Sequence, residues 1–298
     1  MPSPLQELSS PLLSEKKIQL YIKRDDLIHP LLSGNKWRKL KYNLLSAKEQ
    51  QFKTLLTFGG AYSNHIHAVS AAGNLLGFKT IGIIRGEASR GLSPTLTFAQ
   101  AQGMQLHFVD RQSYRKKQDA TFIQDLKKQF TEFYHIPEGG SNDLALKGVA
   151  ELVKELDAQL PGQRLTVCTA CGTGGTLAGL ISADAKQQHR FLGFPVLKNA
   201  NWMYEDVTKL LNNKIDSNWS LMLDYHFGGY AKYNGQLLEF IHQFKTEFSI
   251  QLEQVYTAKM LFGIFDLIKQ DYFSPGTTIV AIHTGGLQGL VDFNNENI

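Results

Sequence analysis

A small cluster near the N-terminus has the residue types and spacing for covalent chemistry. The stretch Gly34-Asn35-Lys36-Trp37-Arg38-Lys39-Leu40 places a lysine after a glycine turn, with two more cations within three residues. Most such clusters are the solvated start of a basic helix. Alternatively, Lys36 forms a covalent imine with a phosphorylated cofactor, and a second cation binds the phosphate. That interpretation requires a phosphate-binding loop and acid–base residues elsewhere in the chain.

A glycine-rich loop, Cys171-Gly172-Thr173-Gly174-Gly175-Thr176, offers such a phosphate site. Glycines let the backbone approach an anion, and the N–H groups at a helix N-terminus favour phosphate. The loop is not a Walker loop, and Ala178 stands where a dinucleotide fingerprint has its third glycine. A tight turn without a ligand explains the loop equally well. The functional interpretations left open are a single phosphate on a small cofactor and a nucleotide-binding module without other chemistry.

The triplet Ser63-Asn64-His65 follows an apolar run and two glycines, and it precedes a helix of small residues. Helix capping alone explains Ser63 or Asn64. The functional alternative is a cradle for a substrate carboxylate, made by backbone N–H groups and the serine hydroxyl. His65 and His67 are two residues apart and do not share a helix face, so we expect no metal site there.

Composition limits the classes of protein that the chain can be. Its 298 residues are 43% hydrophobic and 19% charged, which is typical of one large globular domain or two interlocked ones. The net charge of +4 permits anionic small molecules and is no nucleic-acid signature. With neither a signal peptide nor a run of membrane-spanning length, we expect a cytoplasmic protein that binds neither nucleic acid nor membrane. Cys168 and Cys171 supply only two of the four ligands of a structural zinc, and a redox role for them stays open.

The elements that must position these residues alternate along the chain. Strands are expected at 20–23, 54–58, 80–84, 105–109, 133–136, 165–169, 190–196, 220–225 and 277–282. Helices are expected at 40–51, 66–73, 93–102, 114–130, 143–156, 177–183, 234–244 and 258–269. Residues 1–19 are expected to lie along the surface. This alternation predicts an α/β fold of mostly parallel sheets wrapped by helices.

Taken together, the motifs resemble those of the D-cysteine desulfhydrase and 1-aminocyclopropane-1-carboxylate deaminase family, which depends on pyridoxal phosphate. Lys36 and Ser63 lie 27 residues apart, and Tyr230 and Tyr256 lie 26 apart, which are the family's separations. The resemblance runs in order from about residue 20 to 290, through the following motifs: 34–40, 59–65, 137–142, 171–180, 255–259 and 283–286.

The resemblance implies a tryptophan-synthase β-like fold, in which two open, twisted, mostly parallel sheet domains hold the cofactor between them. Residues 40–147 would form the small domain, and residues 1–39 with 148–298 the large one. It also implies a homodimer that acts on a small amino acid.

The same resemblance implies roles for individual residues. Lys36 would bond pyridoxal 5'-phosphate, and Lys39 would contact the phosphate together with the loop. Thr284 would face the pyridine nitrogen. Arg38 has no site role. The phosphate loop would comprise Gly172, Thr173, Gly174, Gly175 and Thr176.

The substrate side of the site follows from the resemblance too. Ser63, Asn64 and His65 would hold the substrate carboxylate, and Asn64 would also bond the cofactor's phenolic oxygen. Tyr230 and Tyr256 would act in catalysis with Lys36 and Ser63.

Two threonines distinguish the branches of the family. The deaminase branch carries Glu after the second tyrosine and Leu before the final Gly-Gly, whereas this chain has Thr257 and Thr284. We therefore expect α,β-elimination of D-cysteine to pyruvate, hydrogen sulfide and ammonia. The alternatives are cyclopropane ring opening to 2-oxobutanoate and a non-catalytic protein that binds the cofactor. One departure is His67, which stands where the family usually has Arg.

Overall fold

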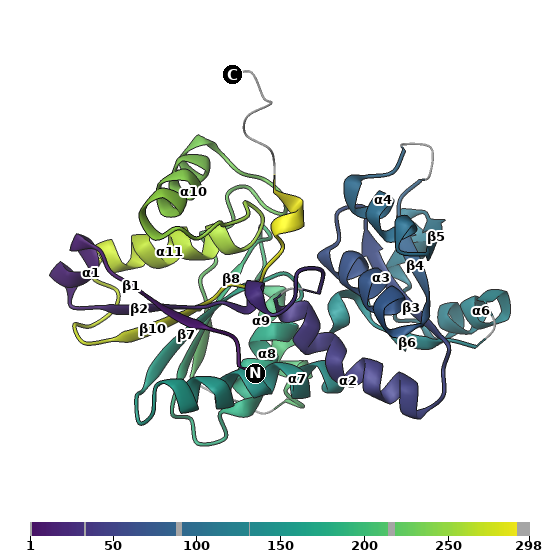
Figure 1. The fold of residues 1–298 in the computed structure, drawn as a ribbon, viewed down its shortest axis with the longest axis horizontal. Helices are drawn as coiled ribbons and strands as arrows, with labels where there is room; N and C mark the ends of the chain where they lie inside the picture. The colour runs from purple at the N-terminus through teal and green to yellow at the C-terminus, as the bar shows by residue number, and fades with distance from the viewer. Residues whose placement is uncertain (1, 33, 88–90, 131, 214–217, 291–298) are drawn as a thin grey trace.

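Two separate sheets divide the chain into a smaller and a larger half (Figure 1). The computed structural model describes residues 2–32, 34–87, 91–130, 132–213 and 218–290. Within these residues the smaller sheet has the order β5-β4-β3-β6, and all its pairs are parallel. Its strands are β3 (Thr54–Gly60), β4 (Lys79–Arg85), β5 (Met104–Val109) and β6 (Tyr134–Ile136), connected through α3 (Asn64–Leu76), α4 (Pro94–Ala101), α5 (Arg111–Arg115) and α6 (Ala120–Phe130).

The larger sheet joins the two ends of the chain. In the described residues its order is β1-β2-β10-β7-β8-β9, and β1 alone among the strands of this sheet runs antiparallel to its neighbour. Its strands are β1 (Leu5–Leu8), β2 (Gln19–Lys23), β7 (Leu165–Cys171), β8 (Arg190–Pro195), β9 (Trp219–Leu221) and β10 (Thr278–Ile282). The helices of this half are α1 (Pro11–Lys16), α7 (Asp143–Gln159), α8 (Gly175–Ala183), α9 (Trp202–Leu210), α10 (Gly235–Phe248) and α11 (Thr257–Lys269). Helix α2 (Asn35–Glu49) links the two halves, and its Leu40, Leu44 and Ala47 pack in the core of the smaller one.

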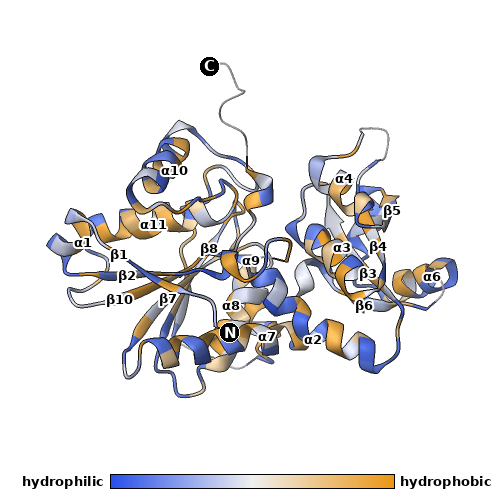
Figure 2. Ribbon diagram, in the orientation of Figure 1, coloured by the Kyte–Doolittle hydropathy of each residue, from blue (hydrophilic) through white to orange (hydrophobic). Residues whose placement is uncertain are grey.

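Helices cover both faces of the larger sheet, as parallel strands require. Helices α10 and α11 lie on one face and α7 and α8 on the other, while α2 runs toward the smaller sheet (Figure 1). Every residue of β7 is buried, and the apolar strands appear as orange ribbons in Figure 2. The chain thus has the α/β architecture with mostly parallel sheets that the sequence predicts.

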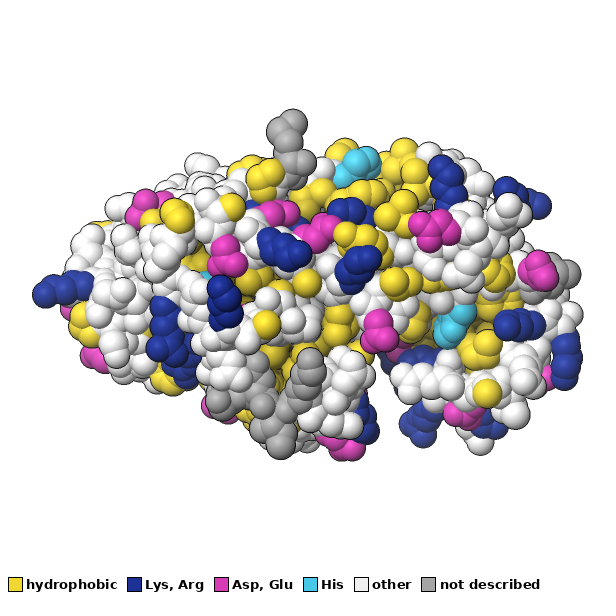
Figure 3. All heavy atoms as spheres, turned by 90° about the horizontal axis from the view of Figure 1, so that it is seen from below, with side chains coloured by type: hydrophobic (Ala, Val, Ile, Leu, Met, Phe, Trp, Pro, Cys, Tyr) yellow, Lys and Arg dark blue, Asp and Glu magenta, His cyan; other side chains and the backbone are white. Residues whose placement is uncertain are grey.

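On the face seen in Figure 3, cationic and anionic side chains are interspersed.

Three expected elements differ from the observed ones. Helix α2 begins at Asn35, so Lys36 lies in its first turn instead of before it. The expected helix over 114–130 is two helices, because the break lets Tyr114 and Leu126 reach the same apolar cluster. The expected strand over 220–225 ends at Leu221, since the chain turns to place the Tyr225 hydroxyl on Asp266.

Three elements were not expected at all. The N-terminal segment contributes the edge strand β1 and the short helix α1 instead of lying along the surface. The third is helix α9, which follows β8.

No helix in the described ranges is long and apolar enough to cross a membrane.

Candidate active site

A cavity of about 1360 Å³ opens between the carboxyl ends of the two sheets. In parallel α/β sheets this edge is where ligands bind. All the site residues predicted from the sequence line the cavity: Lys36, Lys39, Ser63, Asn64, His65, Gly172, Thr173, Gly174, Gly175, Thr176, Tyr230, Tyr256 and Thr284. Residues far apart in the sequence are therefore brought together as the motifs require.

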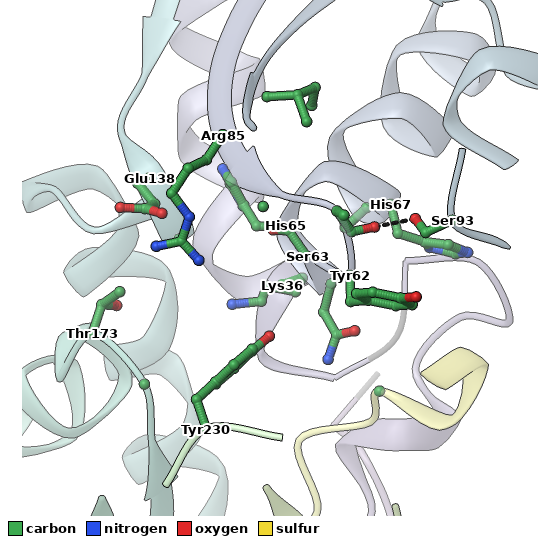
Figure 4. A pocket seen from close by; sticks show the side chains of 18 of the residues that line it. Lys36, Tyr62, Ser63, His65, His67, Arg85, Ser93, Glu138, Thr173 and Tyr230 are labelled. Atoms are coloured by element: carbon green, nitrogen blue, oxygen red, sulfur yellow. Dashed lines mark hydrogen bonds between the residues drawn. The ribbon is translucent and has the colours of Figure 1, made fainter. Parts of the chain in front are cut away.

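The turn before Lys36 is packed against the C-terminal strand. Gly34 has φ +68°, and a Cβ there would lie 1.7 Å from the carbonyl oxygen of Thr284. Only glycine fits this approach. The turn directs the half-buried Lys36 side chain into the cavity (Figure 4). Desolvation in the cavity lowers the pKa of Lys36 to about 8, so a large fraction of its amines are neutral near physiological pH.

Arg38 fixes the start of helix α2 through ion pairs with two carboxylates. Its Nε donates to Asp25 Oδ2 over 2.6 Å, and its Nη1 donates to Glu155 Oε1 over 2.8 Å. The carbonyl of Asp25 in turn accepts the N–H of Gly34 over 2.8 Å. Burial would raise the pKa of Glu155, but hydrogen bonds from Arg38 and Lys23 outweigh it and hold that pKa at about 2. Arg38 thus fixes the start of α2 and faces away from the chemistry.

The glycine loop forms an uncapped helix N-terminus. Strand β7 ends at Cys171, Gly174 has φ +73°, and no side chain caps α8. By contrast, α3, α4, α5, α7 and α10 each have a side-chain oxygen that accepts a first-turn N–H. The free N–H groups of α8 at the cavity wall are therefore suited to an anion.

Lys39 adds a buried cation to this loop. Its Nζ donates to the carbonyl of Gly139 over 3.0 Å and to Ser141 Oγ over 3.3 Å. A Cβ on Gly175 would lie 3.0 Å from the same Nζ. No carboxylate pairs with Lys39 in the part of the chain that the structure describes. Burial and the neighbouring Lys36 hold the pKa of Lys39 well below its usual value, and a phosphate bound beside the amine would raise that pKa and favour its charged form. The loop and Lys39 together fit a phosphate.

Ser63 caps α3, as the helix-capping interpretation of the sequence predicts. Its Oγ accepts the N–H of Ile66 over 3.3 Å. The cap leaves the amides of Asn64 and His65 without an intrahelical acceptor, since they belong to the first turn. The Asn64 Oδ1 accepts from Gln288 over 2.9 Å, so its amide nitrogen stays available as a donor.

The His65 side chain reaches back to β3. Thr57 Oγ1 donates to the carbonyl of Ile136 over 2.9 Å, and it lies 2.9 Å from His65 Nε2. The proton between them therefore sits on Nε2. Burial and the charges of Lys36 and Lys39 hold the pKa of His65 well below its usual range, so the ring is neutral. At this position the group offered to a ligand is the backbone N–H.

Tyr230 and Tyr256 meet edge to face. Their ring centroids are 6.1 Å apart at an interplanar angle of 73°. Burial raises the pKa of both phenols, and more so for Tyr256, so both are protonated donors. Tyr256 also lies against the loop, because a Cβ on Gly172 would lie 3.2 Å from its ring.

Sequence reasoning missed two residues that hold these tyrosines. The buried Glu253 carboxylate accepts the N–H groups of Val255, Tyr256 and Thr257 and so caps α11. The buried Lys259 donates to the carbonyls of His226 and Gly229, each over 2.8 Å, and so fixes the loop that ends at Tyr230. Lys259 belongs to a motif noticed in the sequence, but its partners lie about thirty residues away.

The two cysteines and His67, which the sequence analysis also named, pack against apolar or aromatic side chains. Cys168 and Cys171 are buried free thiols in two different apolar clusters on opposite sides of β7. Burial raises the pKa of Cys168 above its usual range and that of Cys171 to about 12, which disfavours the reactive thiolate form of both. His67 stacks on Phe98 with centroids 3.9 Å apart. The described residues contain no cluster of His, Cys, Asp or Glu that could hold a metal.

Comparisons with known proteins agree with this geometry. A family described as pyridoxal-phosphate dependent enzyme matches residues 1–285. The bifunctional D-cysteine desulfhydrase/1-aminocyclopropane-1-carboxylate deaminase of Arabidopsis thaliana is 31% identical, over 98% of this chain and 78% of its own. The D-cysteine desulfhydrase of Klebsiella pneumoniae is 27% identical, over 98% of this chain and 94% of its own.

Solved structures agree as well. The crystal structure of an ACC deaminase homologue matches with a TM-score of 0.83 and 30% identity, covering 97% of this chain and 90% of its own. The chain therefore belongs to the family of pyridoxal-phosphate dependent enzymes, among its lyases, and pyridoxal phosphate is its cofactor.

Proposed function

We propose that this chain catalyses α,β-elimination of D-cysteine to pyruvate, hydrogen sulfide and ammonia. The observation that carries the proposal is the pairing of Lys36, with a pKa of about 8, with two protonated tyrosines in one cavity. This set can remove one proton and donate another. The relatives from A. thaliana and K. pneumoniae are both named D-cysteine desulfhydrases.

Each part of the cavity has one task in this proposal. Bound pyridoxal phosphate would supply an electron sink at the α-carbon. The N-terminus of α8 and Lys39 would hold its phosphate, and Lys36 would hold it covalently. Asn64 would donate to its phenolic oxygen, and the Thr284 hydroxyl would face its pyridine nitrogen. A hydroxyl there does not force that nitrogen to be protonated.

The substrate meets the opposite wall. Its carboxylate lies at the N-terminus of α3, on the Ser63 hydroxyl and the amides of Asn64 and His65. Lys36, once the substrate amine has displaced it from the cofactor, takes the α-proton in its neutral form. The Cβ–S bond then breaks with its electron pair on sulfur, and the hydroxyl of Tyr230 or Tyr256, whose rings meet edge to face, protonates the leaving thiolate. The aminoacrylate released reacts with water to give pyruvate and ammonia.

The assembly is proposed on the same basis. Residues 40–147 would move as the small domain against residues 1–39 and 148–298, which would close the cavity. By resemblance to the family we also propose a cytoplasmic homodimer, which sedimentation of the purified protein would test.

A second candidate is ring opening of 1-aminocyclopropane-1-carboxylate. The bifunctional name of the A. thaliana relative favours it, whereas Thr257 and Thr284 favour the desulfhydrase branch. A third is a protein that binds the cofactor without turnover, and the complete set of catalytic side chains in the cavity speaks against it.

A keto-acid assay distinguishes these candidates. The purified holoenzyme is incubated with D-cysteine, L-cysteine, other D-amino acids and the cyclopropane acid. We expect pyruvate and sulfide in equal amounts, with D-cysteine the best substrate. Formation of 2-oxobutanoate from the cyclopropane acid alone would refute the branch assignment, and no product from any of them would favour the non-catalytic alternative.

A further inference from the structure

Arg85 enters the cavity from the smaller sheet. It is the last residue of β4, and its Cα pairs with Gly60 on β3 and Val109 on β5. Figure 4 shows its guanidinium on the same side of the cavity as Glu138, above Lys36 and Tyr230. The side chain therefore lies at the wall that faces the tyrosines.

No carboxylate of the described ranges forms an ion pair with this guanidinium. Arg24 and Arg38 are both held by carboxylates, at 2.7 Å and 2.6 Å. Within the described residues Arg85 has no hydrogen bond or ion pair; its side chain is exposed, and its guanidinium carbon lies 5.8 Å from the centroid of the Tyr114 ring. Glu138 is engaged elsewhere, because it accepts from the Tyr114 hydroxyl over 2.7 Å and pairs with Lys117 at 3.3 Å.

The other anionic groups of the reaction already have their sites. The N-terminus of α8 with Lys39 suits the phosphate, and the N-terminus of α3 suits the substrate carboxylate. An amino acid held with its carboxylate at α3 and its amine toward Lys36 presents its side chain to the wall that remains. That part of the cavity lies between Tyr230 and Arg85.

We propose that Arg85 is a specificity-determining residue that binds a negatively charged group on the β-carbon of the substrate. The inference rests on the proposed elimination and names its substrate class, which is amino acids whose β-substituent is already negatively charged when the substrate binds, as in the thiolate form of D-cysteine. A planar guanidinium with several N–H donors matches a phosphate or carboxylate in two-point contact. Arg85 stabilises the charge of the leaving group as the Cβ bond breaks.

O-phosphoserine is a suitable probe of this class. Its Cβ–O bond breaks with the electron pair on oxygen, inorganic phosphate leaves, and the α-proton goes to Lys36. Water then converts the aminoacrylate to pyruvate and ammonia, so atoms balance without an oxidant or reductant. β-Chloro-D-alanine undergoes the same elimination from an uncharged side chain and serves as the neutral comparison.

The experiment compares kcat/KM for the D and L forms of O-phosphoserine with kcat/KM for β-chloro-D-alanine in the holoenzyme. The specificity ratio is kcat/KM for phosphoserine divided by kcat/KM for β-chloro-D-alanine. We expect Arg85→Gln to lower this ratio by about tenfold to a hundredfold, as for loss of a charged hydrogen bond. Arg85→Lys, which keeps the positive charge, should retain part of the preference for phosphoserine over β-chloro-D-alanine. Arg111→Gln, which removes a charge from another residue lining the cavity, should leave the ratio unchanged.

A binding measurement accompanies the kinetics. Calorimetry with D-aspartate and D-alanine, which carry no leaving group, should give tighter binding of aspartate, and Arg85→Gln should abolish the difference. An equal loss for both substrates in Arg85→Gln, or equal binding of both ligands by the unaltered enzyme, would overturn the proposal. If no substrate gave pyruvate, the proposed elimination would fail, and the aspartate comparison would still decide the role of Arg85.

Discussion

The lowered pKa of Lys36 is the property of the site that can be measured most directly. An exposed lysine titrates near 10.4, whereas desolvation in the cavity brings the pKa of Lys36 to about 8. At a pH of about 7.5, roughly a quarter of the Lys36 amines are then neutral, against about 0.1% for an exposed lysine. The expected reactivity therefore differs roughly two-hundredfold, and it rises with pH through about 8.

Competitive labelling of the cofactor-free enzyme measures this difference. The protein receives a trace of isotopically labelled acetic anhydride at a series of pH values, is then fully acetylated, and is digested for mass spectrometry. Lys48, which is exposed near the end of the same helix, provides the reference profile. Pyridoxal phosphate followed by borohydride should protect Lys36 from the label and leave Lys48 accessible.

A half-maximal labelling of Lys36 near pH 8, well below that of Lys48, is the expected result. Overlapping profiles for the two lysines would refute the reasoning, because they would mean that the cavity does not desolvate the amine. Labelling of Lys36 that is unaffected by the cofactor would refute its assignment as the covalent attachment residue.

Three further predictions concern the supporting residues. Gly175→Ala places a Cβ 2.4 Å from the facing serine hydroxyl, so we expect at least about tenfold weaker cofactor affinity by absorbance titration; equal losses in Gly235→Ala, where the space is open, would contradict a local cause. Lys259→Met frees the loop that ends at Tyr230 and should lower pyruvate formation about tenfold with the cofactor still bound, whereas Lys269→Met on the exposed side of the same helix should not. The carboxyl of Glu155, whose pKa is held at about 2, contributes stability that is present above its ordinary pKa of about 4.3 and is lost as the pH falls toward 2. Melting curves should show this acid loss in the native enzyme and not in Glu155→Gln; identical pH profiles would contradict it.

Local patterns predicted most of the regular elements, and the motifs with the family resemblance predicted a set of residues that line the cavity. The strand β10 and the helix α7 are recognisable from apolar runs and their boundaries. The turn at Gly34 and the loop at Gly174 are visible as glycines, although the contact with Thr284 that requires Gly34 lies 250 residues away in the sequence.

Tertiary partners account for what the sequence could not supply. Arg38 and Lys39 look alike in the sequence. In the fold Arg38 pairs with the carboxylate of Glu155, 117 residues away, whereas Lys39 donates to the carbonyl of Gly139, 100 residues away, and so lies beside the glycine loop. For Arg85 the informative fact is the lack of any such acid among the described residues, which only the fold reveals. His65 looked like a ligand residue, yet its ring is bonded to Thr57 eight positions earlier.

The central claim is that Lys36 and the tyrosines eliminate the thiol of D-cysteine. The most direct test follows pyruvate and sulfide release from D-cysteine by the holoenzyme, alongside its visible absorbance, in the native chain and in Lys36→Ala. We expect equal amounts of both products from the native enzyme, and loss of the cofactor absorbance and of turnover in the variant. Unchanged absorbance or sulfide release in Lys36→Ala would contradict it.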